Sequence, residues 1–320
     1  MPDQAVVARG IERHFGDKRA VAGVDLSVEA GEVYGFLGPN GAGKSTLTRV
    51  LCTLLAPTRG TAQVAGHDVV EDATAVRLRI GVALQEAALD DKQTGLEMLR
   101  LQGRFYGLTT RETAQRVAAL RELIDIGDAL DDRVATYSGG MKRRLDVALA
   151  LVHNPQVLFL DEPTTGLDPI SRAAVWAEIR RLNRELGMTV FLTTQYLEEA
   201  DALAGRVGII NHGLIVAEGT PEELKRTIGT DVVVVEVADR PGSARTALAG
   251  VSGIRSIDVE AHRLMVSVED GARAISPVAL ALDRSGITVR ELALRRPTLD
   301  DVFFRVTGER IGDDDETVRP

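Results

Sequence analysis

A glycine-rich stretch that ends in a lysine and two hydroxyl residues has the residue types and spacing to hold a phosphate group. It matches the pattern G-x-x-x-x-G-K-[ST], called Walker A, with Gly38, Pro39, Asn40, Gly41, Ala42, Gly43, Lys44, Ser45 and Thr46. Glycines let the backbone take positive φ and approach a phosphate, and successive N–H groups at a helix N-terminus then form an anion-binding nest. Lys44 supplies a positive charge for the β- and γ-phosphates, and the Ser45 hydroxyl is a ligand for Mg²⁺. The stretch therefore predicts a nucleotide-phosphate site.

The segments on either side of this loop have the structure that the motif requires. Residues 32–37 are typical of a short buried strand, and residues 47–55 carry apolar side chains at helical spacing. A glycine-rich turn can match the pattern by chance. The strand–loop–helix context argues against that alternative.

A pair of acidic residues, Asp161 and Glu162, follows the apolar run at 157–160. Such a run suits a buried parallel strand, and side chains at its carboxyl end point into the crevice where α/β sheets bind ligands. Asp161 is placed to hold Mg²⁺ directly or through water, and Glu162 to accept a proton from an attacking water. The alternative is a charge pair that faces solvent, and the phosphate-binding loop earlier in the chain favours the catalytic interpretation.

Two further signals are weak when taken alone. Phe15 precedes the phosphate-binding loop, and its ring could equally stack on adenine or pack in the core. Ser138, Gly139 and Gly140 stand before a predicted helix, where they could form a second anion-binding nest or a plain helix cap.

Composition narrows the class of protein. The chain has 320 residues, which suggests about two domains. Its net charge of −9 argues against the nucleic-acid backbone as a partner. We expect no membrane span, since no run of 18 or more apolar residues occurs. The single cysteine excludes an intrachain disulfide, and the start of the chain has no secretory-signal pattern, so we expect a reducing, cytosolic compartment.

Hydrophobic periodicity predicts an α/β fold for the first part of the chain. Two half-exposed antiparallel strands are expected at 5–11 and 24–28, and helical periodicity dominates from about 94 to 151. Further strands are expected at 61–66, 80–84, 157–160, 189–194, 207–210 and 214–217, the last two as a hairpin.

The character of the sequence changes near Gly229. Strand, helix, strand, strand, helix and strand are predicted in turn, at 232–237, 244–249, 254–260, 264–268, 273–285 and 288–294. This order is the βαββαβ arrangement of ferredoxin-like domains. The segment has no cluster of catalytic residues, so we interpret it as an accessory or dimerisation domain.

In their order along the chain, these motifs resemble the nucleotide-binding subunits of ABC transporters. The resemblance covers about residues 6–224. It implies a P-loop NTPase domain with a RecA-like α/β core, an antiparallel β subdomain and a helical subdomain at about 86–155. It also implies roles for the adenine-stacking Phe15, the Q-loop Gln85, the signature Ser138, Gly139, Gly140 and Met141, the Walker B pair Asp161 and Glu162, and the D-loop Asp168. The implied ligands of Mg²⁺ are Ser45, Gln85 and Asp161.

The chain departs from the family pattern at three positions. The signature has Tyr137 for leucine and Met141 for glutamine, changes that should leave the backbone nest and Ser138 intact. Gln195 replaces the switch histidine, which in the family contacts the γ-phosphate. A glutamine amide can donate the same hydrogen bond but cannot become cationic. Glu162, Gln195 and Lys44 are therefore the predicted catalytic residues.

Three strings, at 137–146, 193–201 and 296–304, resemble the ATP-binding subunits of daunorubicin/doxorubicin-resistance exporters of the ABC-2 class. This resemblance implies an ATPase on the cytoplasmic face of the membrane that energises a separate permease exporting a drug, antibiotic or lipid-like molecule. It also implies a homodimer that holds ATP between one Walker A loop and the opposite signature. The predicted boundaries are 1–228 for the ATP-binding domain, 229–310 for the accessory domain and 311–320 for an acidic tail.

Two alternatives stay open at the level of sequence. A soluble ABC protein acting on nucleic acid or ribosomes would commonly carry paired cassettes or a coiled-coil insertion, and we find neither. A soluble regulatory nucleotide switch with slow or no hydrolysis is compatible with Gln195.

Overall fold

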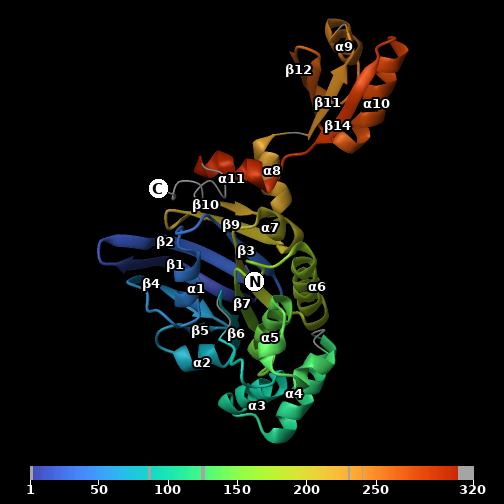
Figure 1. Cartoon of the computed structure of the whole chain (residues 1–320). Helices are drawn as coiled ribbons and strands as arrows, with labels where there is room; N and C mark the ends of the chain where they lie inside the picture. Colours follow the sequence, from blue (N-terminus) through green and yellow to red (C-terminus); the bar gives the residue numbers. More distant parts are fainter. Residues whose placement is uncertain (1–2, 86–87, 124–126, 230, 240, 309–320) are drawn as a thin grey trace, which may run out of the picture. The chain divides into compact units, whose positions relative to one another are not determined.

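A six-stranded sheet forms the centre of the N-terminal part of the chain (Figure 1). Its spatial order is β10-β9-β3-β8-β7-β6, with the bounds β3 Val33–Leu37, β6 Ile80–Ala83, β7 Val157–Asp161, β8 Thr189–Thr194, β9 Arg206–Asn211 and β10 Leu214–Gly219. The strands β3, β6, β7, β8 and β9 run parallel, and β10 pairs antiparallel with β9. Every residue of β3, β7 and β8 is buried, as expected for central strands covered on both faces.

The computed structural model describes residues 3–85, 88–123, 127–229, 231–239 and 241–308. They divide into two compact units, of which the first ends at Pro221 and the second covers Glu222–Gly308. No helix among the described residues is both long enough and apolar enough to span a bilayer.

A second, four-stranded sheet of the first unit has the order β2-β1-β4-β5. Its strands are β1 Gln4–Phe15, β2 Lys18–Glu29, β4 Arg59–Val64 and β5 His67–Asp68, all in antiparallel pairs. The first two strands are longer than the sequence predicts, because a register shift near Gly10, where φ is 56°, lets β1 continue beyond Ile11. This continuation carries the chain as far as Phe15.

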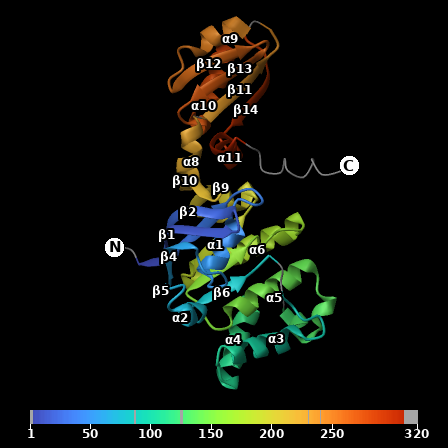
Figure 2. The ribbon, with the colours of Figure 1, turned by 90° about the vertical axis from the view of Figure 1, so that its left-hand side faces the viewer.

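The helices of the first unit either cover the sheets or gather in a helical subdomain. Their bounds are α1 Lys44–Leu51, α2 Ala73–Arg77, α3 Gly95–Phe105, α4 Thr110–Leu123, α5 Gly139–Leu151, α6 Pro169–Leu186 and α7 Leu197–Leu203, with 3₁₀ turns at Gly127–Asp131 and Val134–Thr136. The helices α3, α4 and α5 lie together at one end of this unit (Figures 1 and 2). The helical insertion that the periodicity predicts is thus present.

Four aromatic rings pack together across three neighbouring strands of the central sheet. Phe191 of β8 lies with its ring centroid 5.5–5.6 Å from those of Tyr34, Phe36 and Phe159. All four residues are fully buried. Because Phe191 touches rings from β3 and β7, it helps to fix the two strands whose carboxyl ends carry the predicted site.

The second unit contains an antiparallel sheet in the order β12-β13-β11-β14. Its elements are α8 Pro221–Ile228, β11 Asp231–Val237, α9 Pro241–Leu248, β12 Ile254–Glu260, β13 Arg263–Val268, α10 Gly271–Arg284, β14 Val289–Arg295 and α11 Leu299–Thr307. Alternate residues of β11 and β13 pack with α9 and α10 in one apolar cluster, so both helices cover the same face of the sheet. The predicted βαββαβ arrangement is confirmed.

The second unit also includes two helices outside that arrangement. Arg305 of α11 donates hydrogen bonds to the carbonyl oxygens of Thr227 and Ile228 at 2.9 and 3.2 Å, which ties α11 to the end of α8. The unit accordingly begins at Glu222, whereas the sequence placed the boundary between residues 228 and 229. The acidic tail expected at 311–320 lies outside the described residues.

Candidate nucleotide-binding site

The phosphate-binding loop connects the carboxyl end of β3 to the start of α1. Two of its glycines are required by close approach of other backbone segments. A Cβ on Gly38 would lie 2.5 Å from the carbonyl oxygen of Ile210, and one on Gly43 would lie 2.4 Å from that of Ala20. Gly43 also has a φ of 113°, which favours glycine. The loop is therefore held between β9 and β2 as well as by its own strand and helix.

Lys44 is 4% exposed and has its charge compensated inside the loop. Its Nζ donates hydrogen bonds to the carbonyl oxygens of Gly38 and Pro39 at 2.7 and 3.2 Å, and lies 3.3 Å from Oε1 of Glu162. Burial lowers the pKa of Lys44 below its ordinary value, while the carboxylates of Glu162 and Asp161 act in the opposite direction. This lysine is therefore placed to exchange a carboxylate for another anion, such as a phosphate.

The carboxylate of Asp161 accepts hydrogen bonds from hydroxyl groups on two other elements, α1 and β8. Ser45 Oγ lies 3.2 Å from Asp161 Oδ1, and the hydroxyl of Thr193 on β8 donates to the same oxygen. Carboxylate and hydroxyl oxygens are the ligands that Mg²⁺ prefers, and Mg²⁺ commonly takes only one or two ligands from a protein beside phosphate. The donor set fits the predicted metal. Thr193 was missed in the sequence, where nothing distinguishes it from the other threonines of its strand.

Glu162 takes a left-handed backbone conformation, with φ of 49°, directly after β7. Its backbone N–H donates to the carbonyl oxygen of Thr193 at 3.1 Å, which holds this turn against β8. Its carboxylate meets Lys44 through Oε1 and accepts a hydrogen bond from Gln85 Nε2 through Oε2 at 3.3 Å. The structure thus brings together Lys44, Gln85 and Glu162 from the ends of three different strands.

These residues line a pocket of about 460 Å³. The lining residues are Phe15, Lys18, Ala20, Pro39, Asn40, Gly41, Gly43, Lys44, Ser45, Thr46, Gln85 and Glu162. Lys18 and Ala20, both on β2, have no signal in the sequence that would have indicated a role. The pocket therefore lies between the phosphate-binding loop and the strands β1 and β2 of the antiparallel sheet.

Phe15 lies at this pocket and is 47% exposed, so it is not a core residue. The guanidinium of Arg13 lies over its ring, 4.7 Å from the centroid. The exposure of Phe15 contradicts the alternative that its ring packs in the core, and stacking on adenine stays a prediction.

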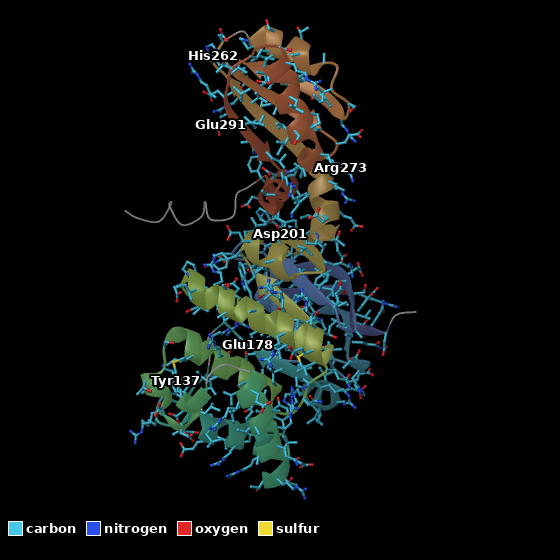
Figure 3. All side chains as sticks on the ribbon, turned by 90° about the vertical axis from the view of Figure 1, so that its right-hand side faces the viewer. Tyr137, Glu178, Asp201, His262, Arg273 and Glu291 are labelled. Carbon is cyan, nitrogen blue, oxygen red and sulfur yellow. The ribbon has the colours of Figure 1, made fainter. Side chains whose placement is uncertain are left out.

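The signature residues do not line this pocket. Ser138 caps α5, because its Oγ accepts a hydrogen bond from the backbone N–H of Met141 at 3.2 Å. Tyr137 is buried beside the helical subdomain (Figure 3), and its hydroxyl donates to the carbonyl of Ala129. The substitution of tyrosine for leucine thus coexists with an intact cap, and Gly139 and Gly140 form the first turn of α5.

The other predicted residues outside the lining are Gly38, Ala42, Asp161, Asp168 and Gln195. Asp168 caps α6 and accepts hydrogen bonds from the backbone N–H groups of Ile170 and Ser171, both at 3.0 Å. Its pKa is lowered by hydrogen bonds, first of all from the Ser171 side chain. Gln195 follows β8 and is half-buried, so its contact with a γ-phosphate stays a prediction.

The ion pair between Arg143 and Asp146, both on α5, was also missed in the sequence. Arg143 of α5 is buried, and its guanidinium donates to the carbonyl oxygens of Leu84 and Asp161 at 2.7 and 3.4 Å. It also pairs with Asp146 at 2.9 Å. Burial raises the pKa of Asp146 to about 6, although Arg143 acts to lower it. The helix that starts with the signature is thereby joined to the backbone just before Gln85 and Glu162, at the carboxyl ends of β6 and β7.

A parallel sheet whose strand ends carry a glycine-rich phosphate loop, a buried lysine and an aspartate–glutamate pair defines a P-loop nucleoside triphosphatase. Comparison with known proteins agrees with this class. The family described as "ABC transporter" matches residues 21–165, and the family described as "ATP-binding protein DrrA1-3-like, C-terminal domain" matches residues 219–307.

Relatives resemble the whole chain. The "Daunorubicin resistance ATP-binding protein DrrA3" of Streptomyces coeruleorubidus is 50% identical over 97% of this chain and 98% of its own. The "Nod factor export ATP-binding protein I" of Sinorhizobium fredii is 39% identical over 97% of this chain and 88% of its own. A solved dimeric ATP-binding cassette, MJ0796 bound to ADP and Pi, superimposes with a TM-score of 0.61 and 25% identity over 67% of this chain and 98% of its own. The chain belongs to the ABC transporter ATP-binding proteins and is an ATPase.

We predict that Asp146 makes stability fall as pH rises. Its pKa is about 6 in the folded protein and 3.8 ordinarily, so the folded state binds more protons between these values. Relative to Asp146→Asn, the wild type should lose up to about 3 kcal/mol of unfolding free energy between about pH 4 and pH 7. Urea unfolding followed by Trp176 fluorescence measures this. Parallel pH curves for the two proteins would contradict it.

Proposed function

We propose that this chain, as a homodimer with ATP and Mg²⁺, drives a separate membrane permease that exports a drug, antibiotic or lipid-like molecule. The observation that carries the proposal is the convergence of Lys44, Gln85, Asp161 and Glu162 on one phosphate-binding loop. In this assignment the chain is peripheral, on the cytoplasmic face of the membrane. Nucleic acid is not among its partners.

The contacts of Lys44 suggest how binding and chemistry are linked. A γ-phosphate at the loop competes with Glu162 for the Lys44 ammonium, since both are anions and Nζ lies 3.3 Å from the carboxylate. Once released, Glu162 accepts a proton from the water that attacks the γ-phosphorus, and the bond to the ADP oxygen breaks. Ser45, Asp161 and Gln85 would hold Mg²⁺, which neutralises charge on the phosphates.

The position of the signature supports a dimer. Ser138, Gly139 and Gly140 begin α5 at a site that does not line the chain's own pocket. Their N–H groups, with those of any helix start, attract anions. In a head-to-tail pair they complete the γ-phosphate cage of the other copy. The solved cassette MJ0796, described as dimeric with ADP and Pi, supports this arrangement by resemblance.

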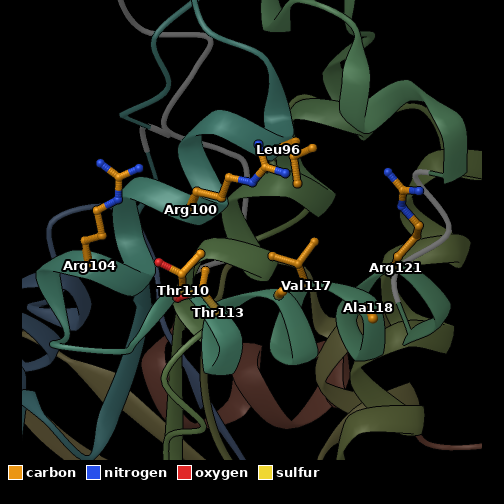
Figure 4. Close-up of a pocket in the computed structure, with 9 residues that line it drawn as sticks. Leu96, Arg100, Arg104, Thr110, Thr113, Val117, Ala118 and Arg121 are labelled. Carbon is orange, nitrogen blue, oxygen red and sulfur yellow. The ribbon is translucent and has the colours of Figure 1, made fainter.

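A groove in the helical subdomain fits a permease segment (Figure 4). It has a volume of about 500 Å³ and lies between α3 and α4. Its floor includes Leu96 and Val117, and its rim carries Arg100, Arg104 and Arg121. Such a lining is complementary to an amphipathic helix with acidic side chains. We assign this groove to an acidic cytoplasmic segment of the permease.

The substrate class rests on the names of relatives, which refer to daunorubicin resistance and to Nod factor export. They favour an exporter over the alternative of a soluble regulatory switch, for which the comparisons offer no support.

The first test is steady-state ATP hydrolysis by the purified protein. We expect Mg²⁺-dependent turnover that Glu162→Gln lowers by about 100-fold or more, since the amide cannot accept the proton. ATP binding by the variant should persist. Wild-type protein that binds ATP but stays inactive even with the permease in lipid would favour the regulatory switch.

The dimer is tested by analytical ultracentrifugation. We expect Glu162→Gln with ATP to sediment as a dimer, because the nucleotide bridges two copies and is not consumed. Adding Ser138→Glu should restore the monomer by placing a carboxylate against the γ-phosphate. A Glu162→Gln protein that remains monomeric at saturating ATP speaks against the homodimer.

The groove is tested by reversing its charge. Arg100→Glu with Arg104→Glu should abolish co-purification with the permease and transport, while ATPase activity of the isolated subunit changes less than about twofold. Arg111→Glu, on the exposed part of α4 outside the groove, is the matched control and should behave as wild type. Unchanged co-purification of the double variant would remove the groove from the interface.

A further inference from the structure

A buried carboxylate stands beside the catalytic machinery without belonging to it. Glu199 on α7 is 0% exposed, whereas its neighbour Glu198 points into solvent. Burying a carboxylate is costly unless hydrogen bonds compensate it. We therefore expect neighbouring groups to donate hydrogen bonds to the Glu199 carboxylate.

One oxygen of the Glu199 carboxylate collects two hydrogen-bond donors from separate elements. Thr164 Oγ1 donates to Oε1 at 2.9 Å, and the indole Nε1–H of Trp176 donates to the same oxygen at 2.8 Å. A carboxylate oxygen can accept both donors because it has no hydrogen of its own and carries two lone pairs. The other oxygen, Oε2, is buried and has no hydrogen-bond partner among the described residues. The side chain of Thr194 acts on the same carboxylate and lowers its pKa.

The residues around Glu199 belong to three segments that carry predicted functional residues. Thr194 ends β8 and immediately precedes Gln195. Thr164 follows Glu162 by two residues and is itself fully buried. Trp176 belongs to α6, the helix that Asp168 caps and that also carries the buried Glu178 (Figure 3). The Glu199 carboxylate thus lies among three segments: the one that leads to Gln195, the turn that contains Glu162, and helix α6.

The surroundings of Glu199 keep it in place. Burial raises the pKa of Glu199, and hydrogen bonds from Thr194, Thr164 and Trp176 lower it, as does the nearby charge of Arg172. The Arg172 guanidinium in turn lies over the ring of Tyr196, 4.5 Å from its centroid. Tyr196 follows Gln195 directly, so a second contact joins α6 to the switch segment.

We propose that Glu199 is a positioning residue for ATP hydrolysis, which holds the segment of Gln195, the turn of Glu162 and helix α6 in one arrangement. The proposal rests on the assignment of hydrolysis to Glu162. Glu199 does not line the nucleotide pocket, and it acts through its two hydrogen-bond donors. A shift of about 1 Å at a catalytic group can lower a rate 100-fold, so the loss of this carboxylate should act on kcat.

The chain provides its own reporter for this arrangement. Trp176 is the single tryptophan in the sequence, and its indole donates to Glu199. Its fluorescence therefore reports on the contact that the proposal invokes. If the arrangement couples the nucleotide site to α6, ATP binding should change this emission in the wild type.

The decisive experiment compares Glu199→Leu with the matched control Glu198→Leu. Leucine has no acceptor oxygen, so the Thr164 hydroxyl and the Trp176 indole both lose their partner. We expect kcat to fall about 10- to 100-fold, with KM for ATP within about twofold. The emission response of Trp176 to ATP should be lost. Glu198→Leu should match the wild type in all three readouts.

Thr164→Val serves as a second variant where Glu199→Leu folds poorly, as judged by circular dichroism and thermal unfolding. It removes one donor and should lower kcat in the same direction with KM unchanged. A folded Glu199→Leu or Thr164→Val protein with wild-type kcat and an unaltered Trp176 response overturns the proposal, since the carboxylate would then serve stability alone. If the wild type itself shows no hydrolysis, the proposed function fails separately, and the ATP response of Trp176 decides the proposal by itself.

Discussion

The buried charge of Lys44 is the constraint on which the rest of the site depends. A 4% exposed ammonium needs acceptors, and the loop supplies two carbonyl oxygens while Glu162 supplies a carboxylate at 3.3 Å. Those partners come from β3 and β7, which are not neighbours in the sheet but both pair with β8. The central strand therefore sets the distance between lysine and glutamate, and the aromatic contacts of Phe191 fix that strand in the core.

The other side chains of the site lie around Lys44 at the carboxyl ends of the parallel strands. Asp161, Glu162, Thr193 and Gln85 all stand at or just beyond strand ends on the same edge of the sheet. Hydrogen bonds across these ends, such as those of Thr193 and Arg143, keep the strand termini in register with one another. The site is therefore rigid where phosphate binds, and its exchangeable contact is the one between Lys44 and Glu162.

Helix α5, which begins with the signature residues, has its N-terminus away from the pocket and a later residue hydrogen-bonded to the backbone at the carboxyl ends of β6 and β7. Its N-terminus lies outside the chain's own pocket, yet Arg143, one turn further along, donates hydrogen bonds to the carbonyl oxygens of Leu84, just after β6, and of Asp161, the last residue of β7. The second unit has its own apolar core, and every residue that lines the pocket comes from the first unit.

The sequence by itself determined the phosphate-binding loop, the acid pair Asp161–Glu162 and the βαββαβ order of the second unit, because short motifs and periodicities are local. Tertiary structure decided the exposure of Phe15, the extension of β1 beyond Gly10, the pairing of Lys44 with Glu162 and the burial of Glu199. The carboxylate that pairs with Lys44 and the donors to Glu199 lie far away in sequence; Thr164 and Glu199, for example, are 35 positions apart. Local pattern cannot specify such contacts, because burial and hydrogen bonding between distant segments arise only when the strands assemble into a sheet.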